Sequence, residues 1–240
     1  MKLKEIIEWI SKKLYTDKIY EQCQEIEWAH IYHDSIRGRK WLEELAIHPG
    51  RWAANYSMLY LLVRILSDYK PDKILEFGLG ESSKIISKFL EHELTQSTHI
   101  IVEHDTEWVE SFSSRFTLSE RSSLLHLELE SKMIHQFLAK SYKGLRGRIV
   151  ESYNLYVIDG PPVSERYSRY DICFLADNFK STDEFIIIMD DYNRKGEQDT
   201  AGDLVKLISD KGIQAYTGTY TGKKSQLVIV TASYRGILSV

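Results

Sequence analysis

A glycine-containing turn between an apolar strand and an amphipathic helix constrains this chain more than any other feature. The segment 76–82 reads Glu-Phe-Gly-Leu-Gly-Glu-Ser, and a helical pattern follows it over 83–90. A strand, a glycine turn and a helix start form the arrangement that holds nucleotide-like cofactors in α/β proteins. Gly78 and Gly80 let the backbone approach a ligand closely and adopt conformations that side chains hinder. The segment therefore predicts a cofactor site.

The size and charge of the chain exclude several classes of protein. The chain has 240 residues, enough for one large domain with a buried core. Its formal net charge is -4 with both signs interspersed, so we expect neither nucleic acid nor an anionic membrane as a partner. Cys23 and Cys173 have no CxxC spacing, so we expect two buried thiols rather than a disulfide or a zinc site. With no long apolar segment and no signal peptide, the sequence predicts a cytoplasmic protein.

The pattern of apolar residues predicts an α/β fold with one structural domain. Residues 1–69 repeat apolar side chains at helical spacing, which predicts an N-terminal helical extension. Residues 70–240 alternate short apolar segments with amphipathic ones, which is typical of a Rossmann-like doubly wound, mostly parallel sheet. The last two of seven strands read as an antiparallel hairpin. The predicted strands are Lys73 to Phe77, His99 to Glu103, Ser123 to Leu127, Asn154 to Asp159, Glu184 to Met189, Gln214 to Tyr220 and Ser225 to Ala232.

Amphipathic segments between these strands predict helices that cover the sheet. We expect helices to fill most of the gaps between strands. They include Ser83 to Leu90, Thr106 to Phe112, Tyr167 to Asn178 and Thr200 to Ser209.

An acidic residue follows the second predicted strand. Glu103 ends that strand, at the edge of the sheet where open α/β sheets bind ligands. It lies 23 residues beyond Gly80, close to where a carboxylate that binds a ribose is expected. The alternative is a solvated acid at the end of a strand.

Two residues near the glycines separate two classes of cofactor. Ser83 stands where a dinucleotide site has its third glycine. Glu76, directly before the turn, repels a pyrophosphate but attracts the ammonium group of an amino-acid moiety. Both residues favour a cofactor with an amino-acid part over a dinucleotide.

In order and spacing, Glu76, Gly78, Gly80 and Glu103 resemble the motifs of class I S-adenosylmethionine-dependent methyltransferases over 70–240. The resemblance implies that the glycine motif, together with Ser82, lines the methionine part of S-adenosylmethionine and that Glu103 holds the ribose. It also implies the antiparallel C-terminal hairpin and an N-terminal lid over residues 1–69. His30, His33 and His48 of this lid are candidate general bases, and Glu128 and Glu130 after the third strand are candidate adenine contacts.

Three carboxylates follow the ends of two later strands. Asp159 ends one strand, and Asp190 and Asp191 directly follow the next. Because such crowding is unfavourable without a compensating cation or proton, a Mg²⁺ ion or another divalent cation is one explanation. The alternative is that the acids cap a helix or pair with Arg166 or Arg194.

The same acids resemble the metal site of the catechol and caffeoyl-CoA type O-methyltransferases. Asp159, Asp190 and Asp191 match the positions that hold the metal in those enzymes. The chain departs from them at Asp191, where they have Asn, and at Pro162, where they have a lysine base. The Asp-Gly-Pro-Pro turn followed by Arg166 resembles bacterial methyltransferase-like proteins, some of which are associated with glycan modification.

These observations predict an S-adenosylmethionine-dependent methyltransferase. We expect O-methyl transfer to a small-molecule or glycan acceptor, with Asp159 and Asp190 as catalytic residues and Asp159 also beside the cofactor. One alternative is an NAD(P)-dependent oxidoreductase, against which Ser83 and Glu76 count. The other is a non-catalytic scaffold that binds the cofactor.

Overall fold

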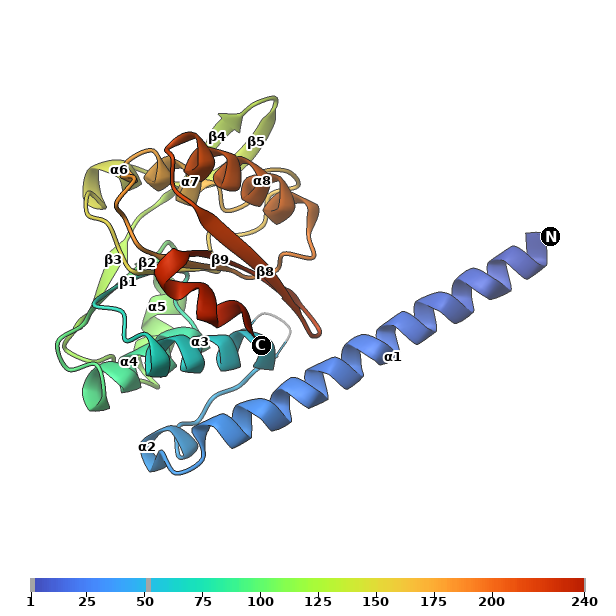
Figure 1. Cartoon of the computed structure of the whole chain (residues 1–240), viewed down its shortest axis with the longest axis horizontal. Helices are drawn as coiled ribbons and strands as arrows, with labels where there is room; N and C mark the ends of the chain where they lie inside the picture. Colours follow the sequence, from blue (N-terminus) through green and yellow to red (C-terminus); the bar gives the residue numbers. More distant parts are fainter. Residues whose placement is uncertain (1–2, 51–52, 240) are drawn as a thin grey trace.

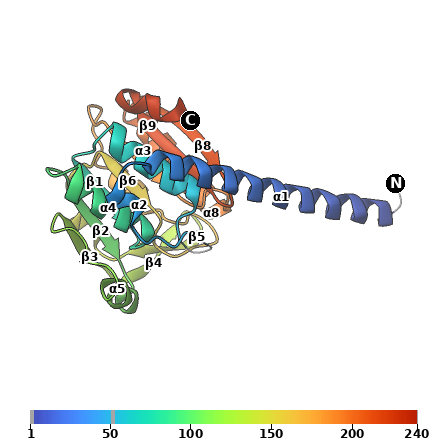
Figure 2. The same cartoon turned by 90° about the horizontal axis from the view of Figure 1, so that it is seen from below.

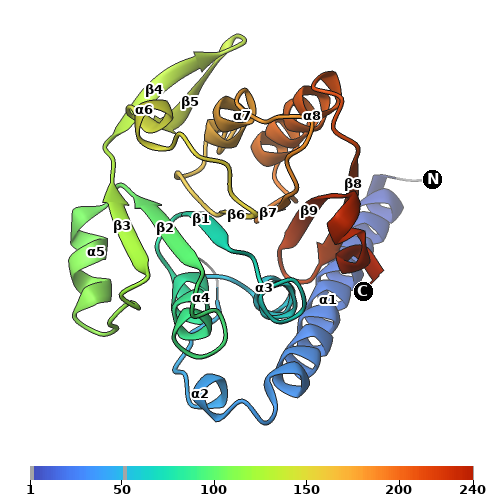
Figure 3. The same ribbon diagram turned by 60° about the vertical axis from the view of Figure 1, so that its left-hand side comes forward.

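A seven-stranded sheet forms the centre of the chain (Figures 1 and 3). The computed structural model describes the backbone of residues 3–50 and 53–239, and the side chains of 13, 16–50 and 53–239. The strands lie in the order β3-β2-β1-β6-β7-β9-β8. They are β1 Lys73–Phe77, β2 Thr98–Glu103, β3 Ser122–His126, β6 Leu155–Ile158, β7 Ile186–Met189, β8 Ala215–Thr221 and β9 Ser225–Thr231.

The direction of the strands matches the prediction. Strands β3, β2, β1, β6 and β7 are parallel, whereas β9 is antiparallel to both β7 and β8. The predicted seven-stranded, mostly parallel sheet with an antiparallel C-terminal hairpin is therefore confirmed. Strand order reverses between β1 and β6, and such a switch point is where open α/β sheets bind ligands.

Helices cover both faces of this sheet. They are α1 Leu3–Ile36, α2 Lys40–Glu43, α3 Tyr56–Asp68, α4 Glu81–His92, α5 Thr106–Ser113, α6 Leu145–Arg148, α7 Asp171–Ala176, α8 Lys195–Asp210 and the 3₁₀ helix η1 Ala232–Ser239. Alternate strand residues face opposite layers: Val157 packs with α3 and α4, whereas Tyr156 packs with α7 and α8. Because both faces are covered, β6 and β7 are apolar and buried at every position.

The long helix α1 contacts the rest of the chain through its C-terminal half. Its N-terminal end extends away from the other elements (Figures 1 and 2). The indole nitrogen of Trp28 donates to the carbonyl of Thr221, 2.9 Å away. Glu25 accepts hydrogen bonds from the side chain of Asn55 and from the backbone amides of Tyr56 and Lys223, each 2.8 Å long. Glu25 therefore ties α1 to the start of α3 and to the β8–β9 turn.

Two segments differ from the predicted elements. The helix expected from Tyr167 begins only at Asp171, because Tyr167 and Arg169 adopt left-handed conformations with φ of 51° and 60° that interrupt a helix. Between β3 and α6 the chain forms an unpredicted hairpin of β4 Leu129–Ile134 and β5 Phe137–Tyr142, which projects from the main sheet (Figure 3). Its turn lacks the glycine or asparagine that identifies most two-residue hairpin turns.

Two sequence-based expectations concern the surface. Cys173 is buried as expected, but Cys23 is exposed on α1, so the expectation of two buried thiols was wrong for Cys23. Among the described residues, no helix combines the length and apolar character needed to cross a bilayer.

Substitution of a core residue in α3 tests how strongly this helix contributes to the fold. Leu62 is fully buried against the sheet, so Leu62→Ala leaves a cavity and is expected to lower the free energy of unfolding by about 2–5 kcal/mol. The matched control Val205→Ala, on the exposed side of α8, is expected to change it by less than about 0.5 kcal/mol. Urea denaturation measures both values. Equal losses in the two variants would contradict the assignment of α3 to the core.

Candidate functional site

A cavity of about 740 Å³ lies at the carboxyl ends of the central parallel strands. Its wall includes the glycine turn after β1, the end of β2, and the loops that follow β6 and β7. This is the edge of the sheet at the switch point between β1 and β6, where α/β folds bind ligands. The position of the cavity makes it the candidate functional site.

The two predicted glycines line the cavity and differ in what they require. Gly78 has φ of 95°, and a Cβ atom there would lie 3.1 Å from the carbonyl oxygen of Asp159. Gly80 has an extended backbone with φ of -167°, and a Cβ atom there would meet nothing within 4 Å. Gly78 is therefore needed for the conformation and for close packing. The expectation that Gly80 adopts a conformation that a side chain would hinder was wrong, because its backbone is extended. The absence of a side chain at Gly80 instead leaves room in the cavity.

The loop after β6 packs closely against the glycine turn. A Cβ atom on Gly160 would lie 2.5 Å from the hydroxyl oxygen of Tyr142 and 3.1 Å from the amide nitrogen of Gly78. Sequence reasoning missed this role of Gly160, although its Asp-Gly-Pro-Pro turn was recognised. The contact brings Asp159 to the same wall as Gly78 and Gly80.

Glu76 lies beneath the glycine turn rather than on the cavity wall. Its side chain is fully buried, and its carboxylate accepts hydrogen bonds from the hydroxyls of Ser82 and Ser83 at the first turn of α4. His99 Nε2 lies 3.1 Å from Glu76 Oε2. Ser82 does line the cavity, but its hydroxyl points to Glu76. Glu76 therefore anchors the start of α4 to β1.

Glu103 lies on the cavity wall with its carboxylate fixed by backbone amides. Its Oε2 atom accepts a 2.9 Å hydrogen bond from Leu79, and Oε1 accepts bonds from His104 and Asp105 of 2.6 and 2.9 Å. The side chain is 6 % exposed. Glu103 thus connects the end of β2 to the glycine turn, and Oε2 keeps a lone pair for a further donor.

Aromatic side chains form the neighbouring part of the wall. Trp108 donates its indole N–H to the carbonyl of Leu79, 2.6 Å away, and Arg115 lies over the Trp108 ring. Tyr142 is buried, and its hydroxyl has no hydrogen-bond partner among the described residues. Burial raises the pKa of Tyr142 well above its usual value, and Glu103 and Asp171 add to this effect. The sequence identified neither ring, because no motif marks Trp108 and Tyr142 lies in the unpredicted hairpin.

Several other predicted residues lie away from the cavity. Glu128 and Glu130, the candidate adenine contacts, do not line it and instead pair with lysines. Of the three candidate histidines only His48 lines the cavity, whereas His30 and His33 are exposed on α1. The backbone amide of His48 donates to the carboxylate of Glu81.

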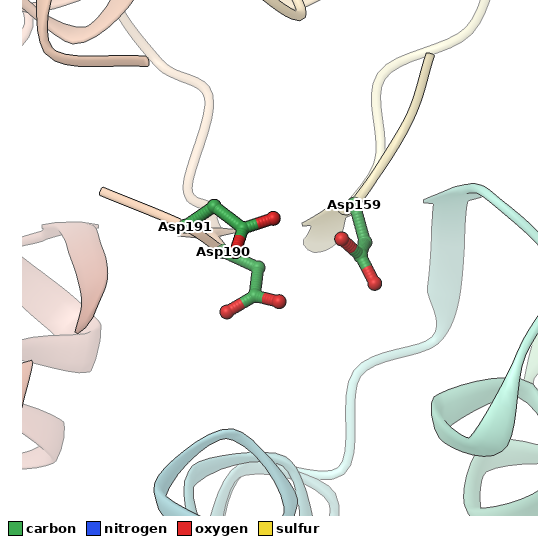
Figure 4. A group of neighbouring side chains, drawn as sticks. All are labelled: Asp159, Asp190 and Asp191. Carbon is green, nitrogen blue, oxygen red and sulfur yellow. The ribbon is translucent and has the colours of Figure 1, made fainter. Parts of the chain in front are cut away.

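The three predicted acids meet at the ends of β6 and β7, as Figure 4 shows. One oxygen from each carboxylate lies within 4.8 Å of the others. Asp159 and Asp191 line the cavity, whereas Asp190 is fully buried and does not. The convergence predicted from the strand ends is therefore present, with Asp190 behind the other two.

Two buried cations pair with these acids. Arg169 Nη2 lies 3.0 Å from Asp159 Oδ1 and 2.6 Å from Asp191 Oδ2. Lys224 Nζ lies 3.0 Å from Asp190 Oδ2 and 3.6 Å from Asp191 Oδ1. Sequence reasoning considered Arg194 and Arg166 as partners. Arg194 does pair with Asp191, at 2.9 Å, but Arg166 pairs with Asp199 outside the cavity.

The surroundings shift the pKa values of two of these acids in opposite directions. Burial, with the charge of Asp190 next, raises the pKa of Asp159 to about 7, although Arg169 and Lys224 oppose the shift. For Asp190, burial alone would raise the pKa, but Lys224, Arg169 and a hydrogen bond from Gln226 outweigh it and lower the pKa below its usual value. Asp159 is therefore the acid on the cavity wall that can exchange a proton near neutral pH.

The oxygen atoms of this cluster do not fit a divalent cation while the two buried cations hold their positions. Asp190 Oδ1 accepts a 2.8 Å hydrogen bond from Gln226, and Oδ2 accepts one from Lys224. Asp191 Oδ2 is shared by Arg169 and Arg194. Mg²⁺ and Ca²⁺ need several free oxygen ligands around one centre. The metal-binding role predicted for Asp159, Asp190 and Asp191 thus requires displacement of cationic side chains.

Solved structures of methyltransferases are similar to this chain. The O-methyltransferase TomG from Streptomyces achromogenes, in complex with SAM, is 12% identical with a TM-score of 0.50, over 84% of this chain and 89% of that chain. An O-methyltransferase from Bacillus cereus in complex with SAH is 14% identical with a TM-score of 0.48, over 84% and 90%. The SAH-bound methyltransferase PaMTH1 from Podospora anserina is 11% identical with a TM-score of 0.45, over 85% and 87%. The likeness to TomG shows that the chain has the methyltransferase fold.

The likeness is one of structure rather than of sequence. No protein-family model and no curated protein sequence matches the chain. The fold that the resemblance implied is therefore confirmed through the structural comparison.

The two glycines provide a matched pair of substitutions. Gly78→Ala is expected to lower the free energy of unfolding by ~1–2 kcal/mol, because it places a side chain at positive φ against Asp159. Gly80→Ala is expected to leave it unchanged within about 0.5 kcal/mol, because its Cβ atom enters open space. Chemical denaturation of both variants checks this difference. A loss in Gly80→Ala as large as that in Gly78→Ala would contradict the described turn.

Proposed function

We propose that this chain is a class I S-adenosylmethionine-dependent methyltransferase that transfers a methyl group to an oxygen atom of a small-molecule acceptor. The observation that carries the proposal is the fixed carboxylate of Glu103 beside the glycine turn on the wall of one cavity. TomG, which has the same fold, was solved in complex with SAM, which supports the choice of cofactor. A glycan acceptor stays a prediction from the sequence.

The adenosyl group is proposed to lie between Glu103 and the aromatic wall. Glu103 Oε2 accepts one hydrogen bond from the protein and is free to accept another from a ribose hydroxyl. Trp108 is 38% exposed and offers a flat apolar surface for a base, and the buried Tyr142 backs the same wall. The missing side chain of Gly80 leaves space for the methionine part, which Ser82 also borders.

Glu76 is proposed to organise the turn rather than to bind the ammonium group of the cofactor. Its carboxylate is fully buried and bound by Ser82 and Ser83, so a ligand in the cavity does not reach it. This role differs from the one that the family resemblance implies.

Asp159 is proposed as the general base. Its side chain is 24% exposed on the cavity wall, and its pKa of about 7 allows it to accept a proton at neutral pH. The acceptor hydroxyl gives its proton to Asp159, its oxygen attacks the methyl carbon, and the carbon–sulfur bond breaks with its electron pair going to sulfur. Such in-line transfer depends mainly on positioning by the walls of the cavity. Asp190, which does not reach the cavity, is assigned a positioning role through Lys224.

The surface beyond Asp159 indicates which acceptors fit. Pro161, Pro162 and Val163 provide an apolar wall, and the Arg194 side chain, which is 32% exposed, lines the same cavity. This combination suits a molecule with an apolar body and an anionic group. Within the described part of the chain, no observation favours a nicotinamide cofactor or a purely structural role over methyl transfer.

Removal of the Glu103 charge tests the cofactor site. Glu103→Gln is expected to weaken the binding of S-adenosylhomocysteine by roughly 10- to 100-fold, because a charge-assisted hydrogen bond to the ribose becomes a neutral one. The control Glu107→Gln changes an exposed acid on the neighbouring helix α5 and is expected to bind normally. Calorimetric titration gives both affinities, and circular dichroism verifies that each variant is folded. Unchanged affinity in Glu103→Gln would refute the assignment.

The raised pKa of Asp159 predicts a pH dependence of turnover. Below pH of about 7 the carboxyl group is protonated and cannot accept a proton, so kcat is expected to fall as the pH decreases. Asp159→Asn is expected to lower kcat by roughly 10²- to 10⁴-fold and to remove this dependence, with little change in cofactor affinity. A panel of phenols, catechols and monosaccharides, with S-adenosylhomocysteine release as the readout, supplies the acceptor. Cofactor binding without methylation of any acceptor would favour the scaffold alternative.

A further inference from the structure

Lys224 lies beside two acids of the cluster, Asp190 and Asp191, at the edge of the cavity. It is the last residue before β9 and comes from the C-terminal hairpin, which the chain reaches long after the acids. The side chain is 10% exposed, yet the residue lines the cavity. Its Nζ atom donates to Asp190 Oδ2 and lies 3.6 Å from Asp191 Oδ1. A buried ammonium therefore already pairs with two of the acids that the predicted metal ion would need.

The cations already present compensate each of the three acids. Arg169 lies within 3.0 Å of Asp159 and Asp191, and Lys224 lies 3.0 Å from Asp190. A divalent cation placed among the same oxygens would lie close to two fixed positive charges in a poorly solvated site, where repulsion is strong. The carboxylate crowding that predicted a metal is thus relieved by side chains of the protein itself.

A buried hydrogen-bond network holds Lys224 through Asp190. The side-chain amide of Gln226 donates to Asp190 Oδ1 and to Asn55 Oδ1, both at 2.8 Å. The Ser57 hydroxyl donates to the side-chain oxygen Oε1 of Gln226, 2.6 Å away. Asp190 is therefore oriented on one side by an amide and on the other by the ammonium group. Satisfied buried networks of this kind fix the side chains that they contain.

We propose that the ammonium group of Lys224 takes the place of a divalent cation in this site, and that it stabilises the negative charge on the acceptor oxygen during methyl transfer. The second part rests on the proposed methyltransferase function. When Asp159 takes the proton of the acceptor hydroxyl, the oxygen becomes negative within a cavity that Lys224 lines. Lys224 keeps its proton throughout, and the charge on the oxygen disappears as the new bond to the methyl carbon forms.

The charged state that this role requires agrees with the surroundings of Lys224. Burial lowers the pKa of the ammonium group, but Asp190, Asp159 and Asp191 outweigh that effect and raise it above its usual value. Four other charged residues of the cluster line the same cavity as Lys224, namely Asp159, Arg169, Asp191 and Arg194. Lys224 is thus a cation and not a candidate base.

Metal binding by the full-length chain tests the first part without any assay of methyl transfer. With Mn²⁺ as the probe, electron paramagnetic resonance is expected to show no specific site in the wild type or in the control Lys223→Met, which changes the neighbouring exposed lysine. Lys224→Met frees oxygen atoms of Asp190 and Asp191 and is expected to raise Mn²⁺ affinity roughly tenfold. The double variant Asp190→Asn, Lys224→Met is expected to lose this gain, and thermal denaturation verifies that each protein is folded.

Two outcomes would overturn the replacement of the metal. One is a specific Mn²⁺ site in the wild type that Asp190→Asn abolishes, which would restore the metal centre predicted from the sequence. The other is a folded Lys224→Met variant with no gain in Mn²⁺ affinity. The metal-binding test does not depend on the proposed function. If the chain failed to bind S-adenosylhomocysteine, the proposed function would be refuted, but the Mn²⁺ affinities could still be interpreted.

Turnover tests the second part. Wild-type activity on an acceptor from the panel is expected to persist in EDTA, whereas Lys224→Met is expected to lower kcat by roughly 10²-fold with little change in S-adenosylhomocysteine affinity. Lys224→Arg, which keeps the charge, is expected to recover part of kcat. Full activity of Lys224→Met without added metal, or equal loss in Lys224→Arg and Lys224→Met, would overturn the electrostatic role.

Discussion

The candidate site depends on one buried guanidinium group that joins the ends of two strands. Arg169 donates to the backbone carbonyls of Ile158 and Asp190, which end β6 and follow β7, and also contacts Asp159 and Asp191. Both Arg169 and Asp191 adopt left-handed conformations, with φ of 60° and 56°. Each conformation costs about 1–2 kcal/mol, so the charged hydrogen bonds between these side chains must offset that strain.

This ionic cluster continues into a neutral network that reaches the N-terminal helix. The Gln226 side chain donates hydrogen bonds to Asp190 and to Asn55, and Asn55 donates to Glu25 on α1. The same Glu25 accepts from the amide of Lys223, beside Lys224. The helix that the sequence presented as a separate extension is thus connected to the site by polar contacts that are partly buried at Asn55 and exposed at Lys223. Loss of any member leaves its partners with unsatisfied groups, so the docking of α1 and the geometry of the acids depend on each other.

Local signals in the sequence were sufficient for most of the fold. The apolar runs of β1, β6 and β7 and the alternating pattern of β8 and β9 are short-range features, and the parallel sheet follows from their order. The hairpin of β4 and β5 was missed because its strands carry charged residues of low strand propensity and its turn has no glycine. The helix predicted from Tyr167 failed for a tertiary reason, since the chain bends there to bring Arg169 to the strand ends.

The limits of sequence reasoning are clearest for the carboxylates. Their positions at strand ends correctly predicted that Asp159, Asp190 and Asp191 lie close together. The carboxyl ends of neighbouring parallel strands lie at the same edge of the sheet.

What compensates their charge does not follow from those positions. Arg169 comes from an irregular loop and Lys224 from the final hairpin, and neither has a fixed spacing from the acids.

A divalent ion and a pair of buried cationic side chains relieve the same repulsion, but their chemistry differs. An ion can bind the acceptor oxygen directly and exchange with solvent, whereas Lys224 is placed by folding and offers one oriented charge. An acidic motif alone therefore indicates only that a compensating cation or proton is needed, and the tertiary fold determines which one is supplied.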